Sequence, residues 1–178
     1  EPIEAVGAVA EAEFKVEAEL VAISTDLRAV ELGTVPFRDS GTQVLAQPTA
    51  AADALEALHL RLDLLRSSSA TAAHVAPFAA TIAATAAELS RAEAALSLLQ
   101  RVQAEWVRLQ PVLSAASLPA SLAREARRFS VMDGLWCRAM AAAEATPRVA
   151  AVAADQKLRD ALSEALASYV LTADNSAG

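Results

Sequence analysis

The sequence predicts an all-α protein, an elongated helical bundle of about five helices with one small β-hairpin near residues 35–45. Apolar side chains recur at the spacing that places them on one face of a helix, as at Val16, Leu20, Ile23 and Leu27. Alanine, the strongest helix former, is abundant, and only 5 glycines and 7 prolines interrupt 178 residues. These features favour long helices joined by short connections.

The first helix is expected over residues 3–32, with Gly33 as its C-terminal glycine. Val6 and Val9 extend its apolar stripe toward the N-terminus. Glutamates recur along its first half, and we interpret them as a solvated face that complements the helix dipole. They are Glu4, Glu11, Glu13, Glu17 and Glu19.

Residues 35–45 carry the strand character of the chain. Two short extended pieces, residues 35–37 and 43–45, flank the turn signal Asp39, Ser40 and Gly41, which indicates a hairpin. A second helix follows, opened by Pro48 with Thr49 as its N-cap and stopped by the serines at 67–69.

Three further helices are predicted. The third starts near Pro77, a residue suited to a first helical turn, and is kinked or ended by Pro111. The fourth covers about residues 119–145, and the fifth is capped by Asp155. Their inward positions are predicted to include Phe78, Ile82, Leu89, Leu96, Leu99, Trp106, Leu113, Leu122, Phe129, Trp136, Met140, Leu158, Leu162, Leu166 and Tyr169.

We therefore expect a single helical segment over residues 1–172. It comprises the first helix, hairpin and second helix (1–66), the long helix (69–113) and the last two helices (119–172), followed by a disordered end at 173–178. Stripes at a 3.5-residue period indicate coiled-coil-like packing, and short connectors indicate antiparallel neighbours.

Charge excludes several classes of partner. The chain carries 15 basic and 22 acidic residues, a net charge of −7, whereas nucleic acids and anionic membranes require a basic face. The uncharged stretch 67–87 contains serine, threonine, histidine and proline, so we do not interpret it as membrane-spanning. The single cysteine, Cys137, excludes an internal disulfide.

The sequence shows no convincing motif for phosphate binding, metal binding or covalent catalysis. Its scattered glycines form no phosphate-binding loop. Glu56 and His59 match one Glu-x-x-His motif, but a di-iron bundle needs two, so we interpret the spacing as chance. Cys137 lies in a helical pattern and is interpreted as a structural thiol. We predict no catalytic, cofactor-binding or metal-binding residues, no cofactor and no small-molecule ligand.

One ordered set of residues resembles a known family. Gln103, Trp106, Leu109 and Pro111 resemble a signature of dynein heavy chains, in which a helix ends with Gln, Trp, an aromatic-Leu-acid group and Pro. The similarity continues downstream with Leu118, Pro119, Arg128, Phe129, Met132, Asp133, Trp136 and Met140. The run at 12–17 and the short connector before Pro119 resemble the dynein of intraflagellar transport, cytoplasmic dynein-2, more than axonemal dyneins.

The chain departs from the family at a few positions. Arg108 and Gln110 stand where the family has a tyrosine and an acid, and Leu113 where it has an aromatic residue. After Tyr169 the family continues through a Lys-Arg pair that this chain lacks.

The resemblance implies the junction between the dynein tail and the linker that precedes the AAA+ ring. It implies a mechanical role in microtubule movement, with the ATP sites elsewhere in the heavy chain. Implied partners are the remainder of the heavy chain and other dynein subunits, in the cytoplasm, the cytoskeleton and the cilium or flagellum. The signature residues it designates are Gln103, Trp106, Leu109, Pro111, Phe129 and Trp136. The alternative is a free-standing helical protein–protein interaction module resembling spectrin.

Overall fold

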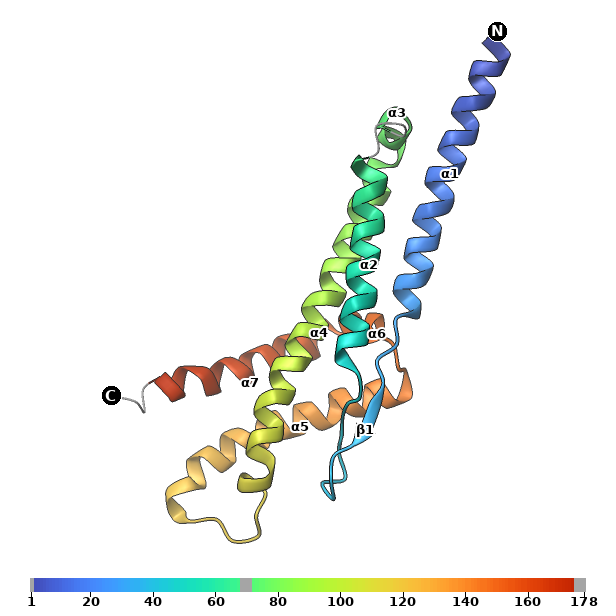
Figure 1. Ribbon diagram of the computed structural model, residues 1–178. Helices are drawn as coiled ribbons and strands as arrows, with labels where there is room; N and C mark the ends of the chain where they lie inside the picture. The colour runs from blue at the N-terminus through green and yellow to red at the C-terminus, as the bar shows by residue number, and fades with distance from the viewer. Residues whose placement is uncertain (1, 68–71, 175–178) are drawn as a thin grey trace.

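The computed structural model describes residues 2–67 and 72–174 and confirms the all-α class with one small hairpin (Figure 1). Five long helices within these residues correspond to the predicted ones. They are α1 (Pro2–Ala29), α2 (Pro48–Ser67), α4 (Ala79–Leu113), α5 (Ala123–Ala145) and α7 (Gln156–Asp174). The short elements are α3 (Ala72–Val75), η1 (Ala76–Phe78), η2 (Ala120–Leu122), α6 (Val149–Ala154), β1 (Thr34–Pro36) and β2 (Gln43–Leu45).

Helix α4 is the spine of the molecule. Helices α1 and α2 run alongside its first half, and α5 and α7 cross its second half, so the bundle is elongated and bent (Figure 1). Residues 79–113 form one long helix whose apolar stripe is continuous over about ten turns. The side chains of α4 that the bundle buries are Ile82, Thr85, Leu89, Ala92, Ala95, Leu96, Leu99, Val102, Trp106 and Leu113.

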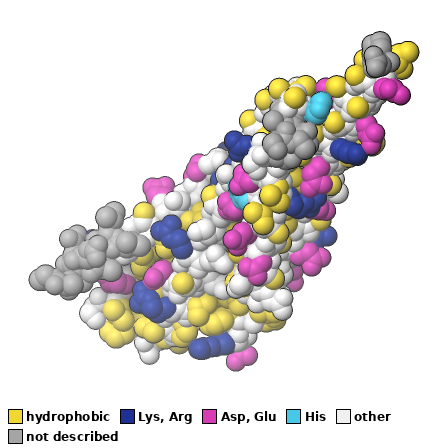
Figure 2. Space-filling view, turned by 45° about the horizontal axis from the view of Figure 1, so that its top comes forward, with side chains coloured by type: hydrophobic (Ala, Val, Ile, Leu, Met, Phe, Trp, Pro, Cys, Tyr) yellow, Lys and Arg dark blue, Asp and Glu magenta, His cyan; other side chains and the backbone are white. Residues whose placement is uncertain are grey.

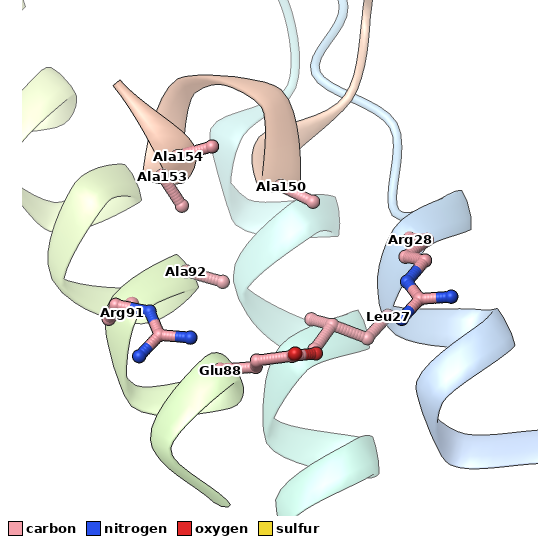
Figure 3. Close-up of a pocket in the computed structure, with 8 residues that line it drawn as sticks. All are labelled: Leu27, Arg28, Glu88, Arg91, Ala92, Ala150, Ala153 and Ala154. Atoms are coloured by element: carbon pink, nitrogen blue, oxygen red, sulfur yellow. The ribbon is translucent and has the colours of Figure 1, made fainter. Parts of the chain in front are cut away.

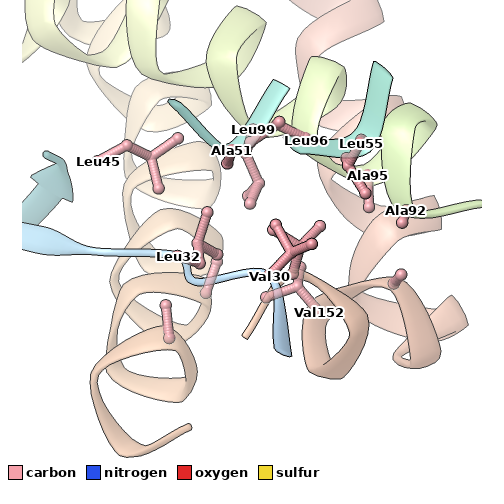
Figure 4. Close-up of a cluster of buried hydrophobic side chains, with 14 of the residues drawn as sticks. Val30, Leu32, Leu45, Ala51, Leu55, Ala92, Ala95, Leu96, Leu99 and Val152 are labelled. Carbon is pink, nitrogen blue, oxygen red and sulfur yellow. The ribbon is translucent and has the colours of Figure 1, made fainter. Parts of the chain in front are cut away.

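The centre of the core lies where α2, α4, α6 and the segment after α1 meet (Figure 4). Small side chains of α4, Ala92 and Ala95, alternate there with Leu96 and Leu99. Alanine lets neighbouring backbones approach closely, and leucine fills the volume between them.

The first helix ends three residues earlier than predicted, at Ala29 rather than residue 32. The Leu32 N–H donates to the Pro147 carbonyl, and the Val149 N–H donates to the Val30 carbonyl, both over 3.1 Å. Residues 30–32 are therefore extended because they pair with the turn between α5 and α6. The prediction placed the end at Gly33 because a sequence shows local helix stops but no pairing with residues more than a hundred positions away.

Other element ends differ from the predictions in smaller ways. Helix α2 begins at Pro48, so Thr49 lies in its first turn rather than at its cap. Pro111 does not end α4, which continues to Leu113. The Leu158 N–H donates to Asp155 Oδ1 over 3.0 Å, which confirms the predicted cap of α7. Of the end predicted to be disordered, 173–174 belong to α7, and 175–178 lie outside the described residues.

The hairpin is short and tightly turned. Its antiparallel strands pair Thr34 with Leu45 and Pro36 with Gln43, one residue before the predicted first strand. Gly41 has φ +73°, which glycine adopts without steric cost, and Arg38 has φ +47°. The Ser40 hydroxyl donates to the Phe37 carbonyl over 2.6 Å and holds this turn.

A charged contact joins α1 to α2 on the surface. Arg61 Nε donates to Glu19 Oε1 over 2.9 Å, and Arg61 Nη1 donates to Asp26 Oδ2 over 2.6 Å. All three side chains are at least one-third exposed, so solvent screens these ion pairs. We therefore expect them to orient α1 against α2 and to contribute little to the free energy of unfolding.

Acidic side chains gather along the side that carries α1 (Figure 2). None of the described helices has an apolar stretch sufficient to cross a bilayer.

Candidate functional site

The aromatic junction, formed by Phe37, Trp106 and Trp136, joins the hairpin to α4 and α5. The rings of Phe37 and Trp106 meet edge to face with centroids 5.3 Å apart, and those of Trp106 and Trp136 lie 6.1 Å apart. Both tryptophans are 0% exposed. Edge-to-face and offset ring pairs add stabilisation beyond the area that they bury. The junction therefore locks three elements that are separated by up to a hundred residues.

Each indole N–H of the junction has an acceptor. Trp106 Nε1 donates to Asp133 Oδ1 over 2.8 Å, and Trp136 Nε1 donates to the Gln43 carbonyl over 3.1 Å. A buried donor without a partner would cost about 1–3 kcal/mol, so these acceptors make full burial of both rings favourable. The first bond fastens α4 to α5, and the second fastens α5 to strand β2.

Gln103 completes the attachment of the hairpin. The Leu45 N–H of β2 donates to Gln103 Oε1 over 2.7 Å, and Leu45 is 4% exposed. Strand β2 is thus held from two sides, by Gln103 of α4 and by Trp136 of α5. A two-stranded hairpin is marginally stable alone, so these bonds and the junction rings supply the order that it lacks.

Replacement of Gln103 by alanine should lower the free energy of unfolding by about 1–3 kcal/mol, because the buried Leu45 N–H would lose its acceptor. Hydrogen exchange at the Leu45 amide should accelerate. Gln100→Ala, on the same helix one turn earlier and similarly half-buried, is the control and should stay within about 0.5 kcal/mol of the parent. Equal losses in both variants would contradict the assigned role.

The remaining predicted signature residues are dispersed. Phe129 is buried at 3% exposure on α5, Leu109 is half-buried, and Pro111 is exposed on the last turn of α4. The structure thus brings Gln103, Trp106 and Trp136 together at the junction, but not the other three.

Sequence reasoning missed three participants, the first of which is Phe37 of the junction, expected only as part of the hairpin. Asp133 accepts the Trp106 bond, and its only signal was its place in the downstream similarity. Thr42 lies with its hydroxyl 3.3 Å from the Cys137 thiol, which is half-buried in a cavity of about 160 Å³. Nothing in the local sequence around residues 42 and 137 indicates this contact, because 95 residues separate them.

The charged cavity between α1, α4 and α6 has a volume of about 220 Å³ (Figure 3). Alanine side chains of α4 and α6 form its floor, and Arg28, Glu88 and Arg91 stand at its rim. Its lining residues include no nucleophile and no histidine, so this cavity offers guanidinium and carboxylate groups but no centre for covalent chemistry.

His59, half of the Glu-x-x-His spacing, faces α4. Its Nε2 lies 2.9 Å from Glu93 Oε1. Within residues 2–67 and 72–174, no group of three or more histidine, cysteine, aspartate or glutamate residues is arranged to hold a metal ion. The pair joins α2 to α4.

Tyr169 of α7 carries the one large pKa shift resolved in the described part of the chain. Its hydroxyl donates to the Glu125 carbonyl over 3.0 Å. Burial raises the pKa of its phenol from 10.0 to about 12, and the nearby Arg128 guanidinium opposes this rise. The folded state therefore favours the neutral phenol over the phenolate.

Because the folded pKa of Tyr169 is raised, its contribution to stability is fully present below about pH 10 and is lost as the pH rises through about 12. The free-energy difference between the parent chain and Tyr169→Phe should shrink over this window in denaturant titrations at successive pH values. Parallel stability curves up to pH 12 would contradict this assignment.

Comparison with known proteins identifies the sequence family. The family described as "Dynein heavy chain, N-terminal region 2" matches residues 1–172. The chain is 25% identical to dynein axonemal heavy chain 3 of Homo sapiens over 168 residues, 93% of this chain and 4% of that protein. It is 25% identical to dynein axonemal heavy chain 1 of Rattus norvegicus over 162 residues, 91% of this chain and 4% of that protein.

The chain thus spans 4% of the length of these relatives. Both are axonemal by name, whereas the similarity to the intraflagellar-transport type stays a prediction. The matched residues include the aromatic junction, four of the five long helices and α7 up to residue 172.

Proposed function

The chain belongs to the dynein heavy chain family, whose N-terminal region 2 its residues 1–172 match, and from this premise we propose that it is a mechanical segment of the tail and linker. In this role it transmits the conformational change that ATP drives in the AAA+ ring and so contributes to microtubule-based movement. Hydrolysis itself takes place in the ring of the parent heavy chain, and we assign no active site to this segment.

The observation that carries the proposal is the spine α4. It is continuous over 35 residues, which corresponds to about 50 Å at 1.5 Å per residue. Its stripe of buried side chains contacts every other long helix of the described chain. A long helix supported along its length by neighbours resists bending, which is what transmission of a displacement requires.

The aromatic junction supports the same role at the far end of the spine. It couples α4 to α5 and both to the hairpin through aromatic rings and part-buried hydrogen bonds. Such contacts are two-state: they are either packed or broken, because close-packed interiors do not deform gradually. A displacement of α5 would therefore move α4 with it.

The proposed partners are the remainder of the heavy chain, including the AAA+ ring and the tail, together with other dynein subunits. The proposed location is the cytoplasm and cytoskeleton, including the cilium or flagellum. The relatives named above are axonemal heavy chains, which supports the ciliary location.

The size of the native polypeptide tests this proposal against a free-standing helical interaction module. An antibody raised against this segment should detect, on a denaturing gel, a band many times larger than the 18.5 kDa of the chain. This follows because the segment spans 4% of its relatives. A native band near 18.5 kDa would overturn the motor role.

A further inference from the structure

Helices α5 and α7 pack against each other where both cross α4 (Figure 1). An open groove of about 670 Å³ lies between them on the surface. Val131, which is 62% exposed, and Leu135 give the α5 wall its apolar surface, and Ala161 and Ala165 line the α7 wall. Contiguous apolar surface in a groove is typical of a site that another chain covers.

Small residues let a helix approach this groove closely. Gly134 lies on the groove side of α5, and a Cβ built there would meet no atom within 4 Å. Ala161 and Ala165 stand one helical turn apart on the opposite wall. Small side chains at a contact bring helix axes to about 8 Å, the near limit of ordinary packing. The shape of the groove therefore suits a third helix that lies along it.

Arginine side chains stand at both ends of the α5 wall. Arg128 and Arg138 line the groove ten residues apart, which is about 15 Å along the helix. Arg124 lies one turn before Arg128 on the same side of α5. Within the described residues, none of these three arginines forms an ion pair with a carboxylate. Their charges are therefore available to a partner.

Acidic side chains do not neutralise this wall. None of the acidic residues of α5 is among the described residues that line the groove, and Asp133 is bonded to Trp106 in the aromatic junction instead. Glu164 of α7 is the one acid in the described lining, and Lys157 lies two turns before it on the same side of that helix. The groove is thus a basic surface on a chain whose net charge is −7.

We propose that the groove between α5 and α7 docks an amphipathic helix of a partner whose apolar stripe is flanked by aspartate and glutamate. Acidic side chains about ten residues apart would pair with Arg128 and Arg138, and apolar side chains between them would cover Val131 and Leu135. A second copy that presented the same groove would place arginines opposite arginines, and like charges beside an apolar seam destabilise pairing. This inference rests on the shape and charge of the groove and not on the motor role.

The test uses the 178-residue chain and two labelled synthetic helical peptides of about three heptads each. Both peptides carry leucine and alanine along one stripe, with glutamate flanks in one and lysine flanks in the other. Because the chain is acidic, its overall charge favours the lysine peptide. Fluorescence anisotropy should instead show the glutamate peptide binding at least about tenfold more tightly, with its affinity falling between about 0.05 M and 0.5 M salt.

Two variants test the groove itself. Gly134→Glu should weaken binding of the glutamate peptide by at least about tenfold, because it adds bulk and negative charge to the groove. It should not lower the midpoint of unfolding, since a Cβ there meets no neighbour and glycine is a poor helix former. Arg128→Gln combined with Arg138→Gln should weaken binding by at least about fivefold. The control, Arg28→Gln combined with Arg91→Gln, removes two positive charges at the cavity between α1, α4 and α6 and should bind like the parent.

Equal binding of the two peptides, tighter binding of the lysine peptide, or affinity equal to the parent's in Gly134→Glu would overturn the proposal. Equal losses in the groove arginine variant and its control would also overturn it, because overall charge would then explain the binding. A concentration-dependent dimer in sedimentation that Gly134→Glu abolishes would do the same, because the occupant would then be a second copy.

Discussion

Replacement of Trp106 by alanine is expected to lower the free energy of unfolding by about 3–5 kcal/mol, the range for removal of a fully buried tryptophan. The ring is 0% exposed and contacts both Phe37 and Trp136, so alanine would leave a cavity between the hairpin, α4 and α5. The loss would also leave Asp133 without the indole donor. Denaturant titration followed by circular dichroism measures the change.

Trp106→Phe is the informative companion of this variant. It retains an aromatic ring in the junction and removes the hydrogen bond to Asp133, so it should lose less stability than the alanine variant. A loss below about 1 kcal/mol for Trp106→Ala would show that the junction does not hold these elements together.

Replacement of Leu162 by alanine is expected to cost about 2–5 kcal/mol. Leu162 is 0% exposed on α7, which packs against α4 and α5, and its truncation would leave a cavity in that core. Hydrogen exchange should accelerate first in α7, because this helix is attached to the bundle by one face.

Leu60→Ala is the matched control for this second variant. It makes the same chemical change at a leucine that is 62% exposed, and it should stay within about 0.5 kcal/mol of the parent chain. If both leucine variants lost the same free energy, the packing assigned to α7 would be wrong.

Helical periodicity was sufficient to predict the fold class. The last long helix, α7, was located because Leu158, Leu162 and Leu166 recur at the period that a one-sided core imposes, and all three are buried. The hairpin was predicted because turn residues at 39–41 separate two short extended pieces.

Contacts distant in sequence could not be predicted in this way. The early end of α1 follows from pairing with Pro147 and Val149, and no local stop signal at Ala29 indicates it. Trp106 and Trp136 were predicted to lie inward, but their hydrogen-bond acceptors, Asp133 and the Gln43 carbonyl, depend on how α5 meets the hairpin. Local pattern decides which face is apolar, whereas tertiary packing decides what that face meets.

The same distinction explains Val6 and Val9. Their spacing correctly extends the apolar stripe of α1, yet both are exposed, because the bundle is shorter than the helix. A sequence shows the stripe but not the length over which neighbours cover it.

Transmission of motion by a stiff α4 can be measured by softening this helix inside a complete motor heavy chain. Ala87→Gly combined with Ala104→Gly changes two exposed positions of α4 and weakens the helix by about 1 kcal/mol at each without removing a core side chain. Ala87→Gln combined with Ala104→Gln is the control, because glutamine retains high helix propensity.

The measurement is microtubule gliding velocity together with the ATP hydrolysis rate of the same preparation. The glycine variant should glide more slowly than the parent while hydrolysing ATP at the parent rate, and the glutamine variant should match the parent in both. Undiminished gliding velocity in the glycine variant, with faster hydrogen exchange along α4 to show that the helix is softened, would contradict the account.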